Sequence, residues 1–253
     1  MRTILGAGEV GMAVVIHGRE IPEYPHQGDT YVMARHGTEY GLQFWNFTNS
    51  RIEVVCTVDG LNILTGKVGD WQTQRGYVVD AHSKPQVIPG FRLDERAAAQ
   101  FRFGGVDASY AARMGQPTNV GVIGAAIFRE RERFPTLAFY SRTLGGGSDT
   151  FGATKGGNFE SRGAMRGAPD MGTEFGRKVD FRTGNTTFER KSSHPDALLT
   201  LQYRSEATLR DLGIDIRRPP VSVAEQPNPF PGSTGCVPPE GWDPRHGTTH
   251  PRR

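Results

Sequence analysis

Residues 6–11 read GAGEVG, the G-x-G-x-x-G spacing with which many proteins bind the phosphates of a dinucleotide. Such a site needs a buried strand before the glycines and a helix after them, so that the pyrophosphate rests on the helix N-terminus. Here the strand before the glycines has at most residues 3–5. Residues 14–16 are β-branched, and Gly18 and Pro22 would end a helix within two turns. We therefore expect a flexible N-terminal arm over residues 1–11 and disfavour a nucleotide-dependent enzyme.

The other residue types that do chemistry show no spacing typical of a metal site or a catalytic triad. Neither H-x-x-x-H on a helix, nor C-x-x-C, nor the nucleophile motif G-x-S-x-G is present. His246 and His250 are four apart, but the intervening GTT and the following Pro251 disfavour a helix. We expect no catalytic residue, no metal ligand and no cofactor. The seven histidines are scattered: His17, His26, His36, His82, His194, His246 and His250.

Three further polar features have simple structural interpretations. Cys56 lies within the apolar run IEVVCTV, which predicts a buried structural thiol, and a bond to Cys236 stays open. Asp59-Gly60 fits a tight hairpin turn, so that turn formation is the simplest role of this aspartate. The run RERER at 129–133 indicates an exposed edge or the end of a strand.

The composition narrows the class of protein. Of 253 residues, 33 are glycine and 17 are proline, and 36% are hydrophobic, which favours turns and short strands over long helices. The net charge of +3 is too small to make nucleic acid the main partner. We see no signal peptide and no apolar stretch near 18 residues, so we expect a protein of the cytoplasm or of a particle assembled there. Asn46 and Asn185 lie in glycosylation patterns that matter only in a secretory compartment.

Short apolar runs separated by turn residues every 8–12 positions predict an all-β fold, a β-sandwich of jelly-roll-like form. The run YGLQFWNF alternates, with Tyr40, Leu42 and Phe44 on one face. Two or three short helices interrupt the strands. We expect them in LDERAAAQF, in SYAARMG, where Gly115 ends the turn, and in EATLRDL, where Ser205 caps the helix and Gly213 ends it.

Two segments differ from this body. Residues 145–176 contain ten glycines with scattered phenylalanine and methionine, and residues 217–253 contain nine of the 17 prolines. We expect a body over 12–144 and 177–216, a Gly-rich loop that orders against a neighbouring surface, and an extended Pro-rich tail. Large apolar side chains gain by burial, so we take four of them as partner-binding residues: Phe151, Phe159, Phe230 and Trp242.

The blocks VDGL, GYVV, GFR, SYAAR and NVGVIG, with their surroundings over roughly residues 14–215, resemble a family of small uncharacterised bacterial hypothetical proteins. The resemblance implies one coherent domain and supplies no site residues. The GAGEVG arm and the enlarged Gly-rich loop are departures from the family's pattern.

Together these features predict a non-enzymatic structural or interaction protein. We expect an oligomeric component of a large assembly, such as a capsid decoration or minor structural protein of a phage virion, held to protein subunits by its arm, loop and tail. The alternative is a carbohydrate-binding module that presents Trp45 or Trp71 to a sugar, although core packing or subunit contact suits both residues better. The partner, the symmetry and any bound glycan stay open.

Overall fold

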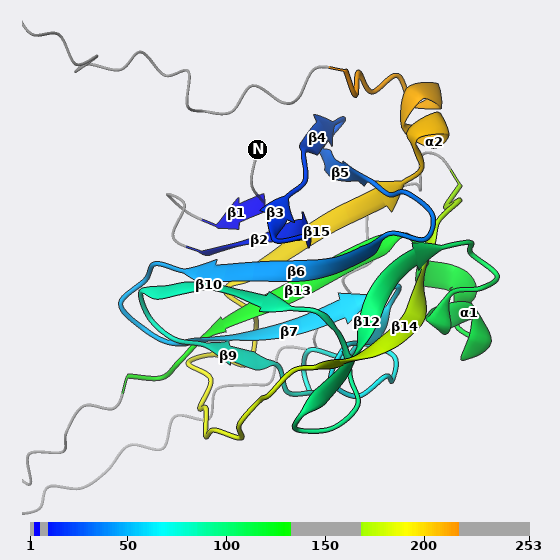
Figure 1. The fold of residues 1–253 in the computed structure, drawn as a ribbon. Helices are drawn as coiled ribbons and strands as arrows, with labels where there is room; N and C mark the ends of the chain where they lie inside the picture. Colours follow the sequence, from blue (N-terminus) through cyan, green and yellow to red (C-terminus); the bar gives the residue numbers. More distant parts are fainter. Residues whose placement is uncertain (1–2, 6–9, 133–167, 218–253) are drawn as a thin grey trace, which may run out of the picture. The chain divides into compact units, whose positions relative to one another are not determined.

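The computed structural model describes residues 3–5, 10–132 and 168–217, which form two β-sheets packed face to face (Figure 1). The all-β sandwich is therefore confirmed, and the arrangement is compatible with a jelly-roll-like form. One sheet has eight strands: β1 (Thr3–Leu5), β2 (Val10–Ile16), β3 (Arg19–Glu20), β6 (Glu39–Asn46), β10 (Ser83–Ile88), β11 (Gly90–Arg92), β12 (Ala97–Gly104) and β14 (Gly172–Asp180). The other has seven: β4 (Glu23–His26), β5 (Asp29–Met33), β7 (Ile52–Val58), β8 (Leu61–Asn62), β9 (Tyr77–Val79), β13 (Val122–Arg129) and β15 (Ala197–Arg204).

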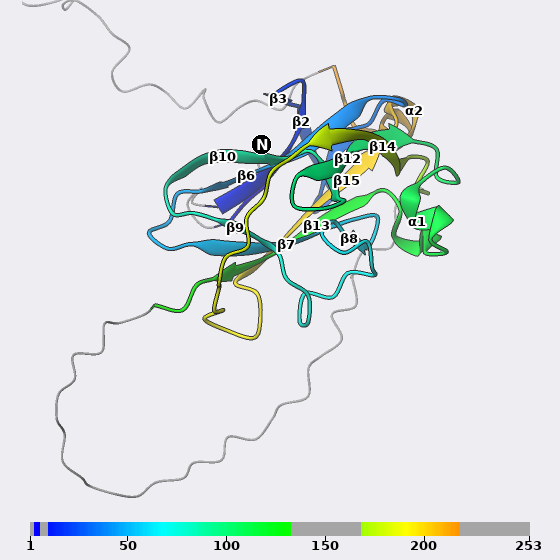
Figure 2. The same cartoon turned by 60° about the horizontal axis from the view of Figure 1, so that its bottom comes forward.

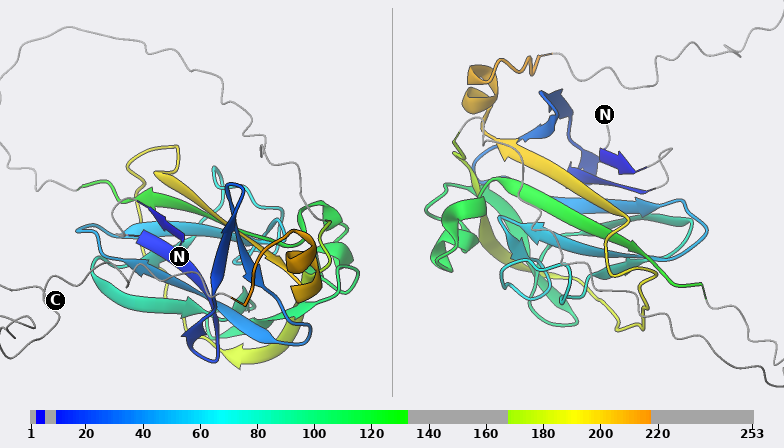
Figure 3. Two further views of the ribbon diagram at one scale, coloured as in Figure 1. Left: turned by 90° about the horizontal axis from the view of Figure 1, so that it is seen from above. Right: turned by 180° about the vertical axis from the view of Figure 1, so that it is seen from behind.

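Among the strands that the structure describes, neighbours are antiparallel except for one pair. In the seven-stranded sheet, β13 lies between β7 and β15, with Ala125 opposite both Cys56 and Leu199. On its other side β15 pairs in parallel with β5, where Tyr203 lies opposite Val32. The view from behind in Figure 3 shows β15 and β13 crossing the molecule side by side. The middle of this sheet therefore joins strands from the beginning and the end of the described chain.

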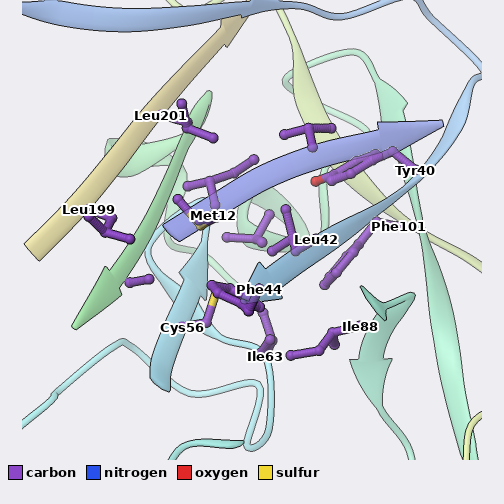
Figure 4. Packing of buried hydrophobic residues seen from close by; sticks show 14 of the residues in the cluster. Met12, Tyr40, Leu42, Phe44, Cys56, Ile63, Ile88, Phe101, Leu199 and Leu201 are labelled. Atoms are coloured by element: carbon purple, nitrogen blue, oxygen red, sulfur yellow. The ribbon is translucent and has the colours of Figure 1, made fainter. Parts of the chain in front are cut away.

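The core lies between the two sheets, as the alternation of apolar residues predicts. Leu42 and Phe44 of β6 are fully buried and face Cys56 of β7 and Leu201 of β15 (Figure 4). Tyr40 extends the same row, with its ring stacked on Phe103 at 4.1 Å between centroids. The predicted burial of the Cys56 thiol is thus confirmed, and burial raises its pKa well above the ordinary range.

Two of the three predicted helices are confirmed. Helix α1 (Tyr110–Arg113) begins at its cap Ser109, and helix α2 (Glu206–Asp211) begins at Ser205, whose hydroxyl accepts from the Thr208 N–H. Gly115 and Gly213 follow them with positive φ. A short 3-10 turn, η1 (Pro117–Asn119), lies between α1 and β13.

The helix predicted for LDERAAAQF is wrong, because this segment forms the start of β12. Ala97, Ala98 and Ala99 are buried, and β12 lies between β14 on one side and β11 and β6 on the other. Alanine favours a helix only where no stronger contact decides. Here the backbone hydrogen bonds to the strands on both sides of β12 outweigh the preference of alanine for a helix.

The boundaries of the predicted arm and loop also change. Leu5 of β1 pairs with Val10 of β2, so residues 10 and 11 belong to the sandwich rather than to an arm. The last five residues assigned to the Gly-rich loop form the start of β14, and Met171 before them is buried. Residues 133–144 of the predicted body lie outside the described residues.

Gly11 has a structural role that the nucleotide pattern does not provide. It lies in a strand, where the dinucleotide site would require a helix, and opposite Trp45 of β6. A Cβ at this position would lie 2.0 Å from Cζ2 of the Trp45 indole, which is 2% exposed. The glycine is therefore explained by the close approach of a tryptophan ring.

Replacing Gly11 with alanine is expected to destabilise the fold, because the Trp45 ring must leave its packed position. We expect a loss of about 1–3 kcal/mol in the free energy of unfolding, measured with urea. Gly105→Ala is the matched control, since no atom lies within 4 Å of its added Cβ. A Gly11→Ala protein as stable as the control would contradict this explanation, whereas partial recovery on adding Trp45→Leu would support it.

Candidate functional site

The four residues predicted to bind a partner, Phe151, Phe159, Phe230 and Trp242, lie outside the described residues. The structure therefore places none of them. Within the described body, two arrangements concentrate polar groups below the surface. One is a buried network around Asp59, and the other is a cleft between β9 and β10.

The buried network ties the two sheets together at one end of the sandwich. The Tyr40 hydroxyl, from β6, lies 2.7 Å from Thr173 Oγ1 of β14, which lies 2.8 Å from the Tyr203 hydroxyl of β15. Tyr203 donates in turn to the Asp59 carboxylate. Asp59 also accepts from the backbone N–H of Gly121 at 2.9 Å and of Thr173 at 2.7 Å. One carboxylate thus holds three separate parts of the chain.

Asp59 forms the predicted turn as well. Asp59 and Gly60 both have positive φ, 54° and 77°, and connect β7 to β8. The prediction of a tight turn is confirmed, but turn formation is only one of two roles of Asp59. The buried carboxylate is a second function of the same side chain, and the sequence contains no local signal for it, since its partner Tyr203 is 144 residues away.

The buried network should make stability depend on pH. Burial raises the pKa of Asp59 to about 6, against an ordinary value of 3.8, although its hydrogen bonds oppose the shift. The folded protein then binds this proton more tightly than the unfolded chain, so the stabilisation is complete below about pH 4 and is lost as pH rises through about 6.

We therefore compare the native chain with Asp59→Asn, which has no proton to titrate at this position. Between pH 4 and pH 7 the native chain should lose about 2 kcal/mol of stability relative to the variant. Other carboxylates titrate in both proteins, and their contributions cancel in the difference. Urea unfolding at five pH values gives both curves, and parallel curves would contradict the assignment.

Arg204 is a second charged side chain in the interior beside this network. Its guanidinium is fully buried and donates to the backbone oxygens of Gly121, at 2.7 Å, and of Tyr203, at 2.8 Å. Burial lowers its pKa, and the nearby negative charge of Asp170 acts in the opposite direction. Arg204 therefore links β15 to Gly121, the residue that precedes β13, and so stabilises the fold.

The cleft opens at the side of the sandwich where β9 belongs to one sheet and β10 to the other. The chain that follows β14, residues 181–188, runs past these two strands (Figure 2). Residues of this segment line the cleft. Backbone bonds fix the beginning of this segment: Phe181 N–H donates to Arg96 O and Thr183 N–H to Glu95 O, both at 2.9 Å. Beyond it, Lys191 N–H donates to Arg129 O. The cleft encloses a volume of about 520 Å³.

Two hydroxyl groups in the cleft have no hydrogen-bond partner among the described residues. They belong to Tyr77 of β9 and to Thr183, and both oxygen atoms are buried. Burial raises the pKa of Tyr77 to about 12, with the positive charge of Arg92 opposing the shift, so the phenol keeps its proton. Both groups can donate a hydrogen bond to an incoming acceptor.

The charges at the cleft are mainly positive. Arg75, Arg92 and Arg182 line it, and none of the three forms an ion pair with a carboxylate in the described part of the chain. The carboxylate that lines the cleft, Glu53, is already bound by Arg190 at 2.6 Å. The unopposed charge favours an anion.

Glu53 and Arg190 shape one wall of the cleft. Glu53 accepts from the Gly76 N–H at 2.8 Å, and Arg190 donates to the backbone oxygens of Trp71 and Gln74, each at 2.7 Å. The Arg190 guanidinium also lies 3.9 Å from the centre of the Phe128 ring. This pair therefore holds the 71–76 loop, and with it Arg75 and Tyr77, against β7.

The structure also places the other residues singled out from the sequence. Trp45 is in the core, and Trp71 is half-buried beside Phe128, at 6.1 Å between ring centres. Asn46 is buried and donates to three backbone oxygens, so it is no glycosylation acceptor in the folded state. The strand end predicted from RERER is confirmed over its described part, where Arg129 ends β13 and Glu130 pairs with Arg51.

Metal-ligating side chains do not gather in groups of three or more anywhere in the described ranges. Among the helices described, none has the length and apolar character needed to cross a membrane. Sequence reasoning missed the cleft, because its residues come from separate strands and carry no motif. No protein-family model, curated protein or solved structure matches this chain.

Proposed function

We propose that the protein is a non-enzymatic interaction protein, a β-sandwich body that serves as one component of a larger assembly. The proposed component is a capsid decoration protein or a minor structural protein of a phage particle. The chain outside the body is proposed to hold neighbouring subunits, through Phe151, Phe159, Phe230 and Trp242.

The length of one connection supports this proposal. β13 ends at Arg129, which lies opposite Ile52. β14 begins at the other end of β13: Thr173 N–H donates to the Asp59 carboxylate, and the Asp59 N–H donates to Val122 O at the start of β13. The return spans one eight-residue strand, about 26 Å at roughly 3.3 Å per residue. The sequence places 35 residues between 132 and 168. Most of that length is surplus to the connection and available for contacts with a neighbour.

The buried ionisable groups give a second line of support. Asp59 is occupied by three donors, Glu53 by Arg190 and the Gly76 N–H, and Arg204 by backbone oxygens. Acid–base catalysis needs a group that can exchange a proton with a substrate. These three groups instead bind parts of the fold to one another.

The native mass of the full chain tests the proposal. Light scattering should give an assembly of several copies, and the variant Phe151→Ser/Phe159→Ser/Phe230→Ser/Trp242→Ser should give a monomer. Phe47→Ser is the matched control, because Phe47 is 47% exposed on the body itself, and it should keep the mass of the native chain. Compact monomers of equal radius for the native chain and the fourfold variant would contradict the proposal.

A carbohydrate-binding module is the alternative, and Trp71 is the aromatic residue that favours it. Trp71 is half-buried with His194 at 6.1 Å between ring centres, whereas Trp45 has no exposed face to offer. Binding to a glycan array that is lost in Trp71→Ala would favour this second function.

A further inference from the structure

The cleft between β9 and β10 has the size of a small-molecule site. Its volume of about 520 Å³ falls within the roughly 300–1,000 Å³ that is usual for pockets that hold a small ligand. Its walls come from both sheets and from residues 181–188, whose backbone bonds to Glu95 and Arg96 hold the beginning of that segment in place. The volume is therefore built by fixed elements.

The charge in the cleft selects an anion. Arg75, Arg92 and Arg182 bring three positively charged side chains to the lining of one cleft, and none of the three forms an ion pair with a carboxylate on the described body. A guanidinium forms paired hydrogen bonds with carboxylate and phosphate oxygens, which an ammonium group does not. Three such groups suit a ligand with more than one acidic group.

The unpartnered hydroxyls mark where further ligand oxygens fit. The Tyr77 and Thr183 oxygens are removed from solvent without a partner on the described chain. A buried polar group without a partner is unfavourable, and an acceptor that reaches it after a local adjustment of the cleft wall removes that disadvantage. The Tyr77 ring packs edge to face with Phe181 at 6.0 Å between centres, which gives the cleft an apolar wall as well.

We propose that this cleft binds a small organic anion that carries two or more carboxylate or phosphate groups. The guanidinium groups of Arg75, Arg92 and Arg182 hold the acidic groups, and the hydroxyls of Tyr77 and Thr183 donate to further oxygens. The Tyr77 and Phe181 rings pack against the carbon skeleton. This site is independent of the proposed assembly and of the segments that would form it.

Calorimetric titration of the full chain with three probes tests the proposal: citrate, fructose 1,6-bisphosphate and uncharged glucose. We expect saturable binding of citrate or of the bisphosphate, and the better of the two tells whether carboxylate or phosphate is preferred. Arg92→Gln and Arg182→Gln should each weaken binding by roughly tenfold or more. Arg113→Gln removes the same charge at an exposed site on α1 and should leave the affinity unchanged.

The hydroxyl variants separate binding from folding. Tyr77→Phe with Thr183→Val should weaken binding by roughly threefold or more, while the midpoint of thermal unfolding stays the same or rises. Two results would overturn the proposal. One is the absence of saturable binding for both anions, or equal binding of glucose. The other is an affinity that survives the arginine variants or the loss of both hydroxyls, which would place the anion elsewhere.

Discussion

Asp59→Ala is expected to lose about 3–5 kcal/mol in the free energy of unfolding at pH 7. The alanine accepts no hydrogen bond, so the N–H groups of Gly121 and Thr173 and the hydroxyl of Tyr203 lose their shared acceptor in the interior. Alanine also tolerates the positive φ of 54° less well than aspartate does. Urea or thermal unfolding followed by circular dichroism measures the loss.

Asp59→Asn is the matched control for this variant, because asparagine keeps the turn conformation and one acceptor oxygen. Its loss at pH 7 should be clearly smaller than that of alanine. Equal losses for the two variants would mean that the second carboxylate oxygen or the negative charge, which both variants lack, determines the effect, and not the turn. Losses below about 1 kcal/mol for both would contradict the structural role assigned to the carboxylate.

Arg190→Ala should lose about 3–5 kcal/mol, because it leaves Glu53 buried without its counter-charge. The backbone oxygens of Trp71 and Gln74 lose their donors at the same time, and Phe128 loses the cation over its ring. The 71–76 loop should loosen, and the cleft wall with it. Equilibrium unfolding measures the stability, and hydrogen exchange of the loop amides reports the loosening.

Two further variants separate charge from geometry at this pair. Arg190→Lys keeps the charge but not the planar set of donors, so it should lose less than alanine and still fall below the native chain. Adding Glu53→Gln to Arg190→Ala removes the unpaired charge and should recover part of the loss. An Arg190→Ala protein with native stability and native exchange rates would contradict the role given to this arginine.

Local patterns in the sequence predict much of this fold. The alternation in YGLQFWNF gives β6 and its buried face, Asp59-Gly60 gives the turn after β7, and Ser205 gives the start of α2. Each of these features is set by residues within a few positions of one another. The error at Ala97–Gly104 has the opposite cause, because two of its neighbours in the sheet, β14 and β6, are far away in sequence and override a local helix preference.

The candidate site is less accessible to such reasoning. Arg75, Tyr77 and Arg92 become neighbours of Thr183 only because β14 leads residues 181–188 past β9 and β10. Their spacing along the chain follows no motif, and a tyrosine in GYVV has the pattern of any strand residue. The sequence does not predict the start of β14, because its glycines favour a loop. In the structure these glycines allow close contact, as where Gly172 lies against Ser109.

The parallel pair of β5 and β15 sets a condition on how the chain folds as it is made. β15 separates β5 from β13, and the β4–β5 hairpin is joined to the seven-stranded sheet through β15. During translation, β4 and β5 are therefore complete at residue 33, whereas their partner strand β15 is complete only at residue 204. Contacts at such sequence separation fold slowly, because a long loop must close before they form. Until β15 has been made, the nascent chain has two open sheet edges, at β5 and at β13, so it depends on β15 for protection against mispairing.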